Sequence, residues 1–218
     1  MKPPITVVDY GIGNLYSVQR ALEQCGVEAI VTADPYRIEQ AASLILPGVG
    51  AFADGMRGLL ERGLDGPLRS YAQSGRRLLG ICLGMQLLAT VSKEFGSHSG
   101  LGLIPGRVAP IPAVGVDGRQ HKVPHIGWSA LVKPSQAPDW KRSILADTVP
   151  GEEVYLVHSY AVIPDSPAHR LADCDYDGQP ICAAIQSGNI FGTQFHPEKS
   201  GSVGLRILQA FCDLPKAP

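Results

Sequence analysis

Short apolar runs alternate with helical patterns along the first half of the chain. Uninterrupted apolar runs predict buried strands at residues 5–8, 27–31, 43–46 and 78–81. Apolar residues at helical spacing predict helices at residues 15–25, 52–62, 67–73 and 83–95. Gly26 is placed to end the first of these helices. This alternation predicts a parallel sheet covered by helices, which is an α/β fold.

Beyond Gly96 the pattern changes, because glycine and proline become frequent and the apolar runs become short. We predict strands at residues 107–111, 126–131, 154–157, 181–186 and 190–195, and a last helix at 202–212. These runs suit a mixed or antiparallel C-terminal extension of the first sheet. The sequence contains no repeat, low-complexity tract or linker, so we predict a single domain over residues 1–218. The expected architecture is an open, mostly parallel, flavodoxin-like sheet flanked by helices, with that extension.

Composition and charge exclude several classes of protein. The 218 residues are 44% apolar with a formal net charge of −1, so they lack the basic bias of a nucleic-acid or membrane-surface protein. The N-terminal apolar run is too short for a signal peptide, and no stretch approaches the roughly 18 apolar residues of a membrane helix. Five widely spaced cysteines argue against a disulfide framework and a structural zinc site. We expect a soluble, cytoplasmic protein with no metal or other cofactor.

The most informative motif is G-x-C-x-G at residues 80–84, between a predicted strand and a predicted helix. A sharp strand-to-helix turn is crowded two residues before and after its centre, and Gly80 and Gly84 remove the Cβ atoms that would clash there. The turn lifts Cys82 to the amino end of a helix, where free N–H groups favour a negative charge. The Leu83 N–H could stabilise an oxyanion there. A free cysteine is usually a small buried hydrophobe, but these glycines favour a nucleophile.

A cysteine nucleophile needs a base, and the base needs a group that orients it. His196 ends a predicted strand and is followed by Pro197 and Glu198. The proline stiffens the link, so that Glu198 can fold back toward the imidazole. Sites in parallel α/β sheets gather at the carboxyl ends of strands, so we expect Cys82, His196 and Glu198 to meet as a catalytic triad.

Three further patterns carry weaker signals. The P-G-V-G at residues 47–50 follows a strand and could present N–H groups to an oxyanion, although a tight turn would explain it equally well. The G-I-G-N at residues 11–14 lacks the third glycine and the acidic residue of a dinucleotide fingerprint, so we predict no nucleotide site. His121 and His125 have a spacing that suits a metal, but Pro124 interrupts it and no acidic or thiol ligand lies nearby.

Together these motifs resemble the class I, triad-type glutamine amidotransferases, and within them the glutaminase subunits of imidazole glycerol phosphate synthase. The P-G-V-G sequence is the most specific, since related amidotransferases usually have P-G-G there. The matching segments follow the family order and lie at residues 9–14 (DYGIGN), 46–52 (LPGVGAF), 80–86 (GICLGMQ), 100–106 (GLGLIPG), 124–128 (PHIGW), 157–160 (VHSY) and 195–199 (FHPEK).

The resemblance implies a role for each matching position. The implied triad is Cys82, His196 and Glu198. The implied oxyanion site is Val49, Gly50 and Leu83. The positions that would hold glutamine are Gly48, Gln86, Glu94, Ser159 and Tyr160. The positions that would face a partner subunit are Trp128, Tyr155 and Lys199.

The implied activity is hydrolysis of glutamine, with the ammonia passed to a (β/α)8 synthase subunit in a heterodimer of histidine biosynthesis. A barrel synthase needs ~250 residues of its own, so we expect the acceptor on another protein. Ser129 stands where the family usually has asparagine, and residues 93–102 are similar to a branch that supplies sugar amidotransferases in surface-polysaccharide synthesis. A non-catalytic scaffold and a cysteine peptidase-like hydrolase also stay open as alternatives.

Overall fold

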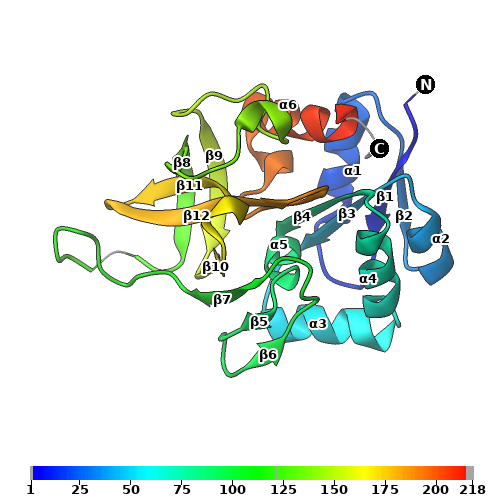
Figure 1. Cartoon of the computed structure of the whole chain (residues 1–218), viewed down its shortest axis with the longest axis horizontal. Coiled ribbons are helices and arrows are strands. Elements are labelled where there is room, and N and C mark those ends of the chain that lie inside the picture. The colour runs from blue at the N-terminus through cyan, green and yellow to red at the C-terminus, as the bar shows by residue number, and fades with distance from the viewer. Residues whose placement is uncertain (1, 121, 215–218) are drawn as a thin grey trace.

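The computed structural model describes residues 2–120 and 122–214, which form two sheets and the helices packed on them (Figure 1). The parallel strands are β1 (Ile5–Val8), β2 (Ala29–Thr32), β3 (Ser43–Gly48), β4 (Arg77–Cys82) and β13 (Ile190–Thr193). They lie side by side in the order β2-β1-β3-β4-β13. This is the 2-1-3-4-5 order of flavodoxin-like sheets, and the predicted α/β class is confirmed.

Four antiparallel strands extend the same sheet. They are β12 (Gln179–Ser187), β11 (Arg170–Tyr176), β8 (His125–Val132) and β9 (Glu153–His158). They continue from β13 in the order β12-β11-β8-β9, so that β2 and β9 are the two edges of the large sheet. The predicted C-terminal extension is therefore present, although the segment that forms β11 was not predicted as a strand.

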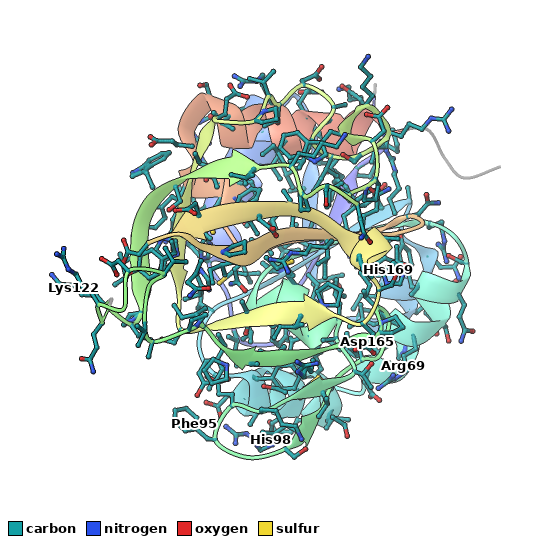
Figure 2. The ribbon with its side chains drawn as sticks, turned by 60° about the vertical axis from the view of Figure 1, so that its left-hand side comes forward. Arg69, Phe95, His98, Lys122, Asp165 and His169 are labelled. Carbon is teal, nitrogen blue, oxygen red and sulfur yellow. The ribbon has the colours of Figure 1, made fainter. Side chains whose placement is uncertain are left out.

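A second, smaller sheet carries the remaining strands. They are β5 (Val91–Ser92), β6 (His98–Ser99), β7 (Gly106–Pro110) and β10 (Tyr160–Pro164). They are arranged in the order β10-β7-β5-β6. The expectation that the strand at 107–111 joins the main sheet is wrong, because Val108 and Val162 are buried in the core on one face of that sheet instead. Phe95 and His98 lie at the outer end of this smaller sheet (Figure 2).

The helix predicted over residues 83–95 is also wrong in length, because α5 (Leu83–Leu87) ends after five residues. The carbonyl oxygens of Leu87 and Leu88 accept hydrogen bonds from the N–H groups of Leu101 and Leu103. The next residues, which include Thr90 and Val91, are poor helix formers and enter a strand. A segment distant in sequence thus takes the backbone acceptors that a longer helix would have used.

Helices cover both faces of the parallel sheet (Figure 1). The helices are α1 (Leu15–Gln24) and α6 (Gly201–Asp213) on one face, α3 (Phe52–Glu61), α4 (Asp65–Gln73) and α5 on the other, and α2 (Pro35–Gln40) near the β2 edge. Short 3₁₀ turns are η1 (Trp140–Arg142), η2 (Pro167–His169) and η3 (Pro197–Lys199). Within the described residues, none of the helices has the length and apolar character needed to cross a bilayer.

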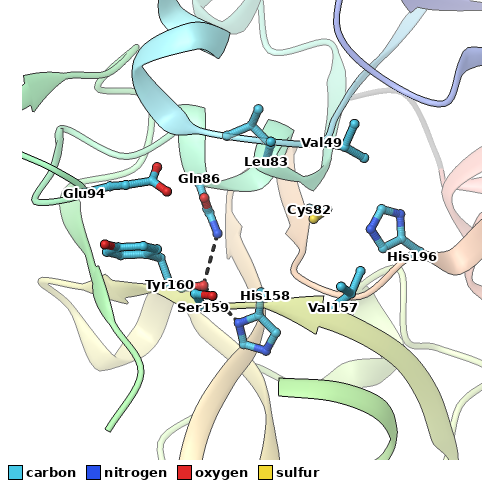
Figure 3. A pocket seen from close by; sticks show the side chains of 11 residues that line it. Val49, Cys82, Leu83, Gln86, Glu94, Val157, His158, Ser159, Tyr160 and His196 are labelled. Atoms are coloured by element: carbon cyan, nitrogen blue, oxygen red, sulfur yellow. Dashed lines mark hydrogen bonds between the residues drawn. The ribbon is translucent and has the colours of Figure 1, made fainter. Parts of the chain in front are cut away.

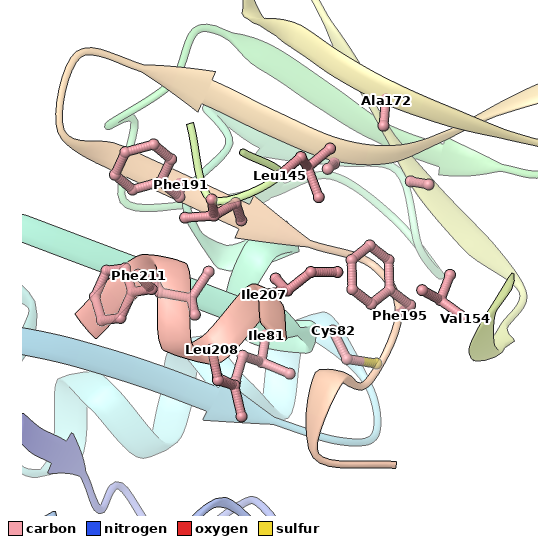
Figure 4. Packing of buried hydrophobic residues seen from close by; sticks show 14 of the residues in the cluster. Ile81, Cys82, Leu145, Val154, Ala172, Phe191, Phe195, Ile207, Leu208 and Phe211 are labelled. Carbon is pink, nitrogen blue, oxygen red and sulfur yellow. The ribbon is translucent and has the colours of Figure 1, made fainter. Parts of the chain in front are cut away.

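The core is divided into two clusters by the sheet. Because side chains alternate along a strand, Val7 packs on the side of α1 and α6, whereas its neighbour Val8 packs on the opposite side. On the first side, Phe211 of α6 meets Phe191 of β13 with ring centroids 6.3 Å apart (Figure 4). This packing fixes β4 and β13 against each other, so the residues at their carboxyl ends are held close together.

Candidate active site

Cys82 is the last residue of β4 and adopts a conformation that side chains rarely take. Its φ is 54° and its ψ is −111°, and its side chain stands at the start of α5. A Cβ atom at Gly80 would lie 2.7 Å from the backbone of Gly84, and one at Gly84 would lie 1.7 Å from the carbonyl oxygen of Leu46. The predicted nucleophile elbow is therefore the observed turn, and both glycines are sterically required.

His196 and Glu198 form a buried pair. The imidazole Nδ1 donates a hydrogen bond to Oε1 of Glu198 at 2.8 Å, and each side chain is only 2% exposed. Because Nδ1 is used in this way, only Nε2 is left for another contact, and it has no hydrogen-bond partner among the described residues. The imidazole lies beside Cys82 (Figure 3). In sites without substrate such contacts are often long and tighten on binding.

Burial by itself would lower the pKa of His196, but two interactions oppose it. The neighbouring Cys82 and Glu198 both favour the protonated imidazole, and together they raise its pKa to about 9. The His196 imidazole is therefore protonated at neutral pH, and it lies beside the sulfur of Cys82. That combination supports nucleophilic attack followed by proton donation to a leaving group.

A pocket of about 240 Å³ opens on the elbow. Its lining residues are Val49, Gly50, Cys82, Leu83, Gln86, Glu94, Val157, His158, Ser159, Tyr160 and His196. Cys82 and His196 lie toward one end, and Glu94 and Tyr160 toward the other (Figure 3). The volume is below the roughly 300–1,000 Å³ of pockets for drug-sized ligands, so it suits a small molecule such as an amino acid.

Nearly all residues expected to hold the substrate or the oxyanion line this pocket. Gly48 is the exception, because it lies on β3 directly beside Cys82 on β4. A Cβ atom at Gly48 would come within 2.2 Å of the Tyr10 hydroxyl oxygen, so only glycine fits there. Its neighbour Gly50 has a φ of 97°, which glycine adopts easily. The backbone of the P-G-V-G stretch therefore passes beside Cys82, with no side chain at Gly48 or Gly50.

The polar groups at the far end of the pocket are held by the protein. The carboxylate of Glu94 accepts a hydrogen bond from the Phe52 N–H at 2.6 Å. The amide nitrogen of Gln86 donates to the carbonyl oxygen of Tyr160 at 3.1 Å and to Oε1 of Gln194 at 3.0 Å. Glu94 offers a negative charge for an ammonium group, and Gln86 keeps its own carbonyl oxygen as an acceptor.

Sequence reasoning assigned no role to His158 or Gln194. His158 lines the pocket and contacts the Tyr160 carbonyl oxygen through Nδ1 at 2.9 Å. Burial lowers the pKa of His158 to about 4, with His125 and His196 acting in the same direction, so its ring is neutral at pH 7. Gln194 is fully buried and contacts Cys82. The V-H-S-Y motif pointed toward His158, whereas nothing in the local sequence singled out Gln194.

The residues expected to face a partner lie close to the triad. Trp128 of β8 pairs with Tyr155 of β9, and their rings are 6.0 Å apart. The Tyr155 carbonyl oxygen accepts a hydrogen bond from the His196 N–H at 3.0 Å. Lys199 is exposed on η3, the 3₁₀ turn that directly follows His196. Trp128 is 53% exposed although it is a large aromatic residue. These three residues are therefore available on one side of the site.

The weak metal signal gains no support. Among residues 2–120 and 122–214, no group of three or more His, Cys, Asp or Glu side chains could hold a metal ion. His125 packs on Tyr176 with ring centroids 3.9 Å apart. His121 lies outside the described residues.

The fold and the site define a class, and the chain belongs to it: it is a class I glutamine amidotransferase, whose family model matches residues 6–213. Its relatives include imidazole glycerol phosphate synthase subunit HisH 1 of Legionella pneumophila (strain Lens), 49% identical over 96% of this chain and 99% of that protein. The subunit HisH of Syntrophotalea carbinolica is 48% identical over 96% of this chain and 100% of that protein.

Solved structures share the fold at lower identity. PurLQS from Thermotoga maritima superposes with a TM-score of 0.71 at 20% identity, covering 97% of this chain and 98% of that chain. The crystal structure of another glutamine amidotransferase gives a TM-score of 0.70 at 19% identity, covering 96% of this chain and 97% of that chain. These likenesses confirm the fold expected of the family.

Proposed function

We propose that this chain is the glutaminase subunit of an imidazole glycerol phosphate synthase. In this role it hydrolyses glutamine to glutamate and ammonia and passes the ammonia to a separate synthase subunit. The observation that carries the proposal is the strained Cys82 beside the His196–Glu198 pair, at one end of a pocket of amino-acid size. The names of the relatives favour histidine biosynthesis over the surface-polysaccharide branch.

The first chemical step is acylation. The sulfur of Cys82 attacks the side-chain carboxamide carbon of glutamine, and the carbonyl oxygen becomes an oxyanion. The backbone at Val49, Gly50 and Leu83 stabilises this charge, and loss of one such donor costs roughly 3 kcal/mol of barrier. His196 gives its proton to the amide nitrogen, the C–N bond breaks, and ammonia leaves. A γ-glutamyl thioester of Cys82 remains.

The second step is hydrolysis of that thioester. His196 takes a proton from water as the water oxygen attacks the thioester carbon, and the bond to sulfur then breaks. Glutamate leaves and the sulfur is again available. In both steps Glu198 accepts a hydrogen bond from the Nδ1–H group of His196, and this bond fixes the orientation of the ring.

Substrate recognition follows from the charges in the pocket. The carboxylate of Glu94 suits the α-ammonium group of glutamine, and the carbonyl oxygen of Gln86 suits an N–H donor. Ser159, Tyr160 and the backbone at Gly48 complete the binding positions. An electrostatic contact at one end and covalent chemistry at the other explain why the pocket selects an amino acid with a side-chain amide.

The ammonia acceptor is a (β/α)8 synthase subunit that docks on the side of Trp128, Tyr155 and Lys199. Together the subunits form a cytoplasmic heterodimer with lyase activity. Glycine-rich backbone at the oxyanion position can change its orientation, so we expect the isolated chain to be a slow glutaminase that the liganded partner accelerates. Full activity in the purified chain alone would contradict this expectation.

The decisive experiment replaces the nucleophile. Cys82→Ser should lower glutamine hydrolysis by at least roughly a thousandfold, because the weakly acidic hydroxyl cannot replace the thiol under the same base. The matched control is Cys212→Ser, a partly buried cysteine on α6 outside the pocket, which should keep wild-type activity. Activity is measured as glutamate release with the partner present.

Two outcomes would overturn the assignment. The first is substantial activity in the Cys82→Ser chain. The second is a wild-type chain in which a glutamine-analogue electrophile fails to label Cys82, as read by mass spectrometry, because a non-catalytic scaffold predicts no labelling. Copurification of a sugar amidotransferase instead of a barrel synthase would move the chain to the other branch and leave its chemistry unchanged.

A further inference from the structure

A line of buried amides connects the substrate end of the pocket to the nucleophile. The amide nitrogen of Gln86 donates to Oε1 of Gln194 at 3.0 Å, and the amide nitrogen of Gln194 lies 3.7 Å from the sulfur of Cys82. The line begins at the Tyr160 carbonyl oxygen, which accepts from the same nitrogen of Gln86. No proposed catalytic step uses Gln194.

The direction of these hydrogen bonds follows from the first of them. A backbone carbonyl can only accept, so Gln86 must present its NH₂ group to Tyr160, and its second hydrogen is then free to point at Gln194. Gln194 must therefore present its oxygen to Gln86. Its own NH₂ group is left to face Cys82, so the sulfur is the acceptor of the last bond.

The position of Gln194 separates it from the substrate. Its side chain is fully buried and is not among the residues that line the pocket. The titratable groups that interact with Cys82 are His196, which is hydrogen-bonded to Glu198, and the buried Tyr10. Gln194 is the one neutral amide that donates to the sulfur among the hydrogen bonds of the described residues.

We propose that Gln194 is a positioning residue that holds the Cys82 sulfur in its anionic form and in line with the pocket. This inference rests on the proposed role of Cys82 as the nucleophile. A donor interacts more strongly with a charged sulfur than with the neutral sulfur of a thioester. Gln194 therefore favours the step in which sulfur leaves as thiolate, and it keeps the resting enzyme ready for attack.

Two substitutions of Gln194 by side chains of similar size distinguish this role from a role in packing alone. Gln194→Met removes the donor and also the acceptor of Gln86. Gln194→Glu keeps an oxygen for Gln86 but places a second carboxyl oxygen against the sulfur. The matched control is Thr193→Val, an isosteric polar-to-apolar change at a fully buried neighbour whose side chain points to the opposite face of the strand.

The kinetic expectation is a change in kcat and not in KM. Gln194→Met should lower kcat about tenfold, the loss that corresponds to roughly 1.4 kcal/mol. Gln194→Glu should lower kcat further, and its loss should grow as pH rises and the introduced carboxyl ionises. KM for glutamine should stay within about twofold for both, because Gln194 does not touch the substrate and the Tyr160 carbonyl oxygen still holds Gln86. Thr193→Val should resemble the wild type.

The rate at which iodoacetamide alkylates Cys82 reports directly on the reactivity of the sulfur, and it can be measured without the synthase subunit. Burial raises the pKa of Cys174 and of Cys212 to about 12 and raises that of Cys25 and Cys182 as well, so reaction near neutral pH favours Cys82. Alkylation of Cys82 at a fixed neutral pH should be about tenfold slower in Gln194→Met than in the wild type, because the donor that favours a charged sulfur is gone. Mass spectrometry of the labelled peptide gives the rate.

The proposal is overturned if Gln194→Glu keeps the wild-type kcat and alkylation profile while Gln194→Met loses activity, because that pattern belongs to packing alone. If neither variant folds, NMR of the otherwise wild-type chain decides. The side-chain amide resonance of Gln194 should shift in Cys82→Ala, and an unchanged resonance would refute the contact. A wild-type chain without glutaminase activity would defeat the proposed function, but alkylation and NMR would still test Gln194.

Discussion

The chemistry of individual residues depends on what surrounds them more than on their type. The two histidines nearest the sulfur are both buried, yet the pKa of His196 is raised to about 9 and that of His158 is lowered to about 4. Burial lowers the pKa of both, but His196 has the Cys82 sulfur and the Glu198 carboxylate as partners. His158 has only a backbone carbonyl and two other imidazoles. At neutral pH the His196 ring is therefore positively charged, whereas the His158 ring is neutral.

This difference predicts the alkaline limb of the activity profile. In the proposed mechanism His196 must be protonated to release ammonia, so kcat should fall as pH rises through about 9. Glu198→Gln keeps the shape of the side chain but removes the charge that supports the protonated ring. In that variant the descending limb should move to lower pH, as measured by glutamate release across both sides of pH 9. A limb at the same pH in both proteins would contradict the role of Glu198.

At the scale of elements, close contacts among β3, β4 and α5 determine the shape of the elbow. The turn between β4 and α5 is pressed against the end of β3, where the Leu46 carbonyl oxygen occupies the space of a side chain at Gly84. The helix that follows has only five residues, so its dipole is small. The conformation of Cys82 therefore owes more to close packing at its glycines than to a long helix.

Gly84→Ala tests that packing. The added methyl group would lie 1.7 Å from the Leu46 carbonyl oxygen, so β3 and the elbow must move apart. We expect a loss of roughly 3 kcal/mol in the free energy of unfolding, measured by urea titration, together with slower alkylation of Cys82.

The control for this change is Gly66→Ala. Gly66 lies in the first turn of α4 with nothing within 4 Å of an added Cβ. Its stability should be unchanged or higher by up to about 1 kcal/mol, because alanine favours a helix over glycine. Equal effects of the two substitutions would show that the elbow tolerates a side chain.

At the scale of the whole molecule, the two edges of the large sheet form separate surfaces. Tyr155 lies on the edge strand β9 and Trp128 on its neighbour β8, whereas β2 and α2 lie at the other edge (Figure 1). Tyr155 also accepts the hydrogen bond of the His196 N–H, so the proposed docking side is joined to the triad through the backbone. Exposed Ile126 and Trp128 alternate along β8 and share one face of it.

Trp128→Ala should therefore weaken binding of the synthase subunit. Loss of an exposed aromatic anchor typically costs about 2 kcal/mol or more, which is roughly 30-fold in Kd. Titration calorimetry with the synthase subunit measures the change, and thermal unfolding should be close to that of the wild type. Tyr36→Ala is the control, because Tyr36 is a 70% exposed aromatic on α2 at the opposite edge of the sheet. Equal losses for both variants would place the partner elsewhere.

Much of the fold was predictable because its signals are local. The parallel strands and the helices that cover them follow from apolar runs and spacing, and Gly80, Cys82 and Gly84 identify the elbow. The helix α2 was missed although Asp34 and Pro35 form a common helix start, and the Asp34 side chain indeed accepts the Tyr36 N–H. The length of α5 was not predictable in this way, since its end depends on hydrogen bonds from residues 101–104.

The sequence by itself determined the α/β class and the types of residue available for catalysis, because apolar periodicity and glycine requirements act over a few neighbouring positions. Only the tertiary structure decided which groups meet. Gln194 faces the sulfur of Cys82 because β13 lies beside β4, and the charge of His196 depends on partners that packing brings to it. The contacts of Cys82 with Gln194 and His196 join residues more than a hundred positions apart, so no local pattern predicts their geometry, whereas Glu198 lies only two residues from His196.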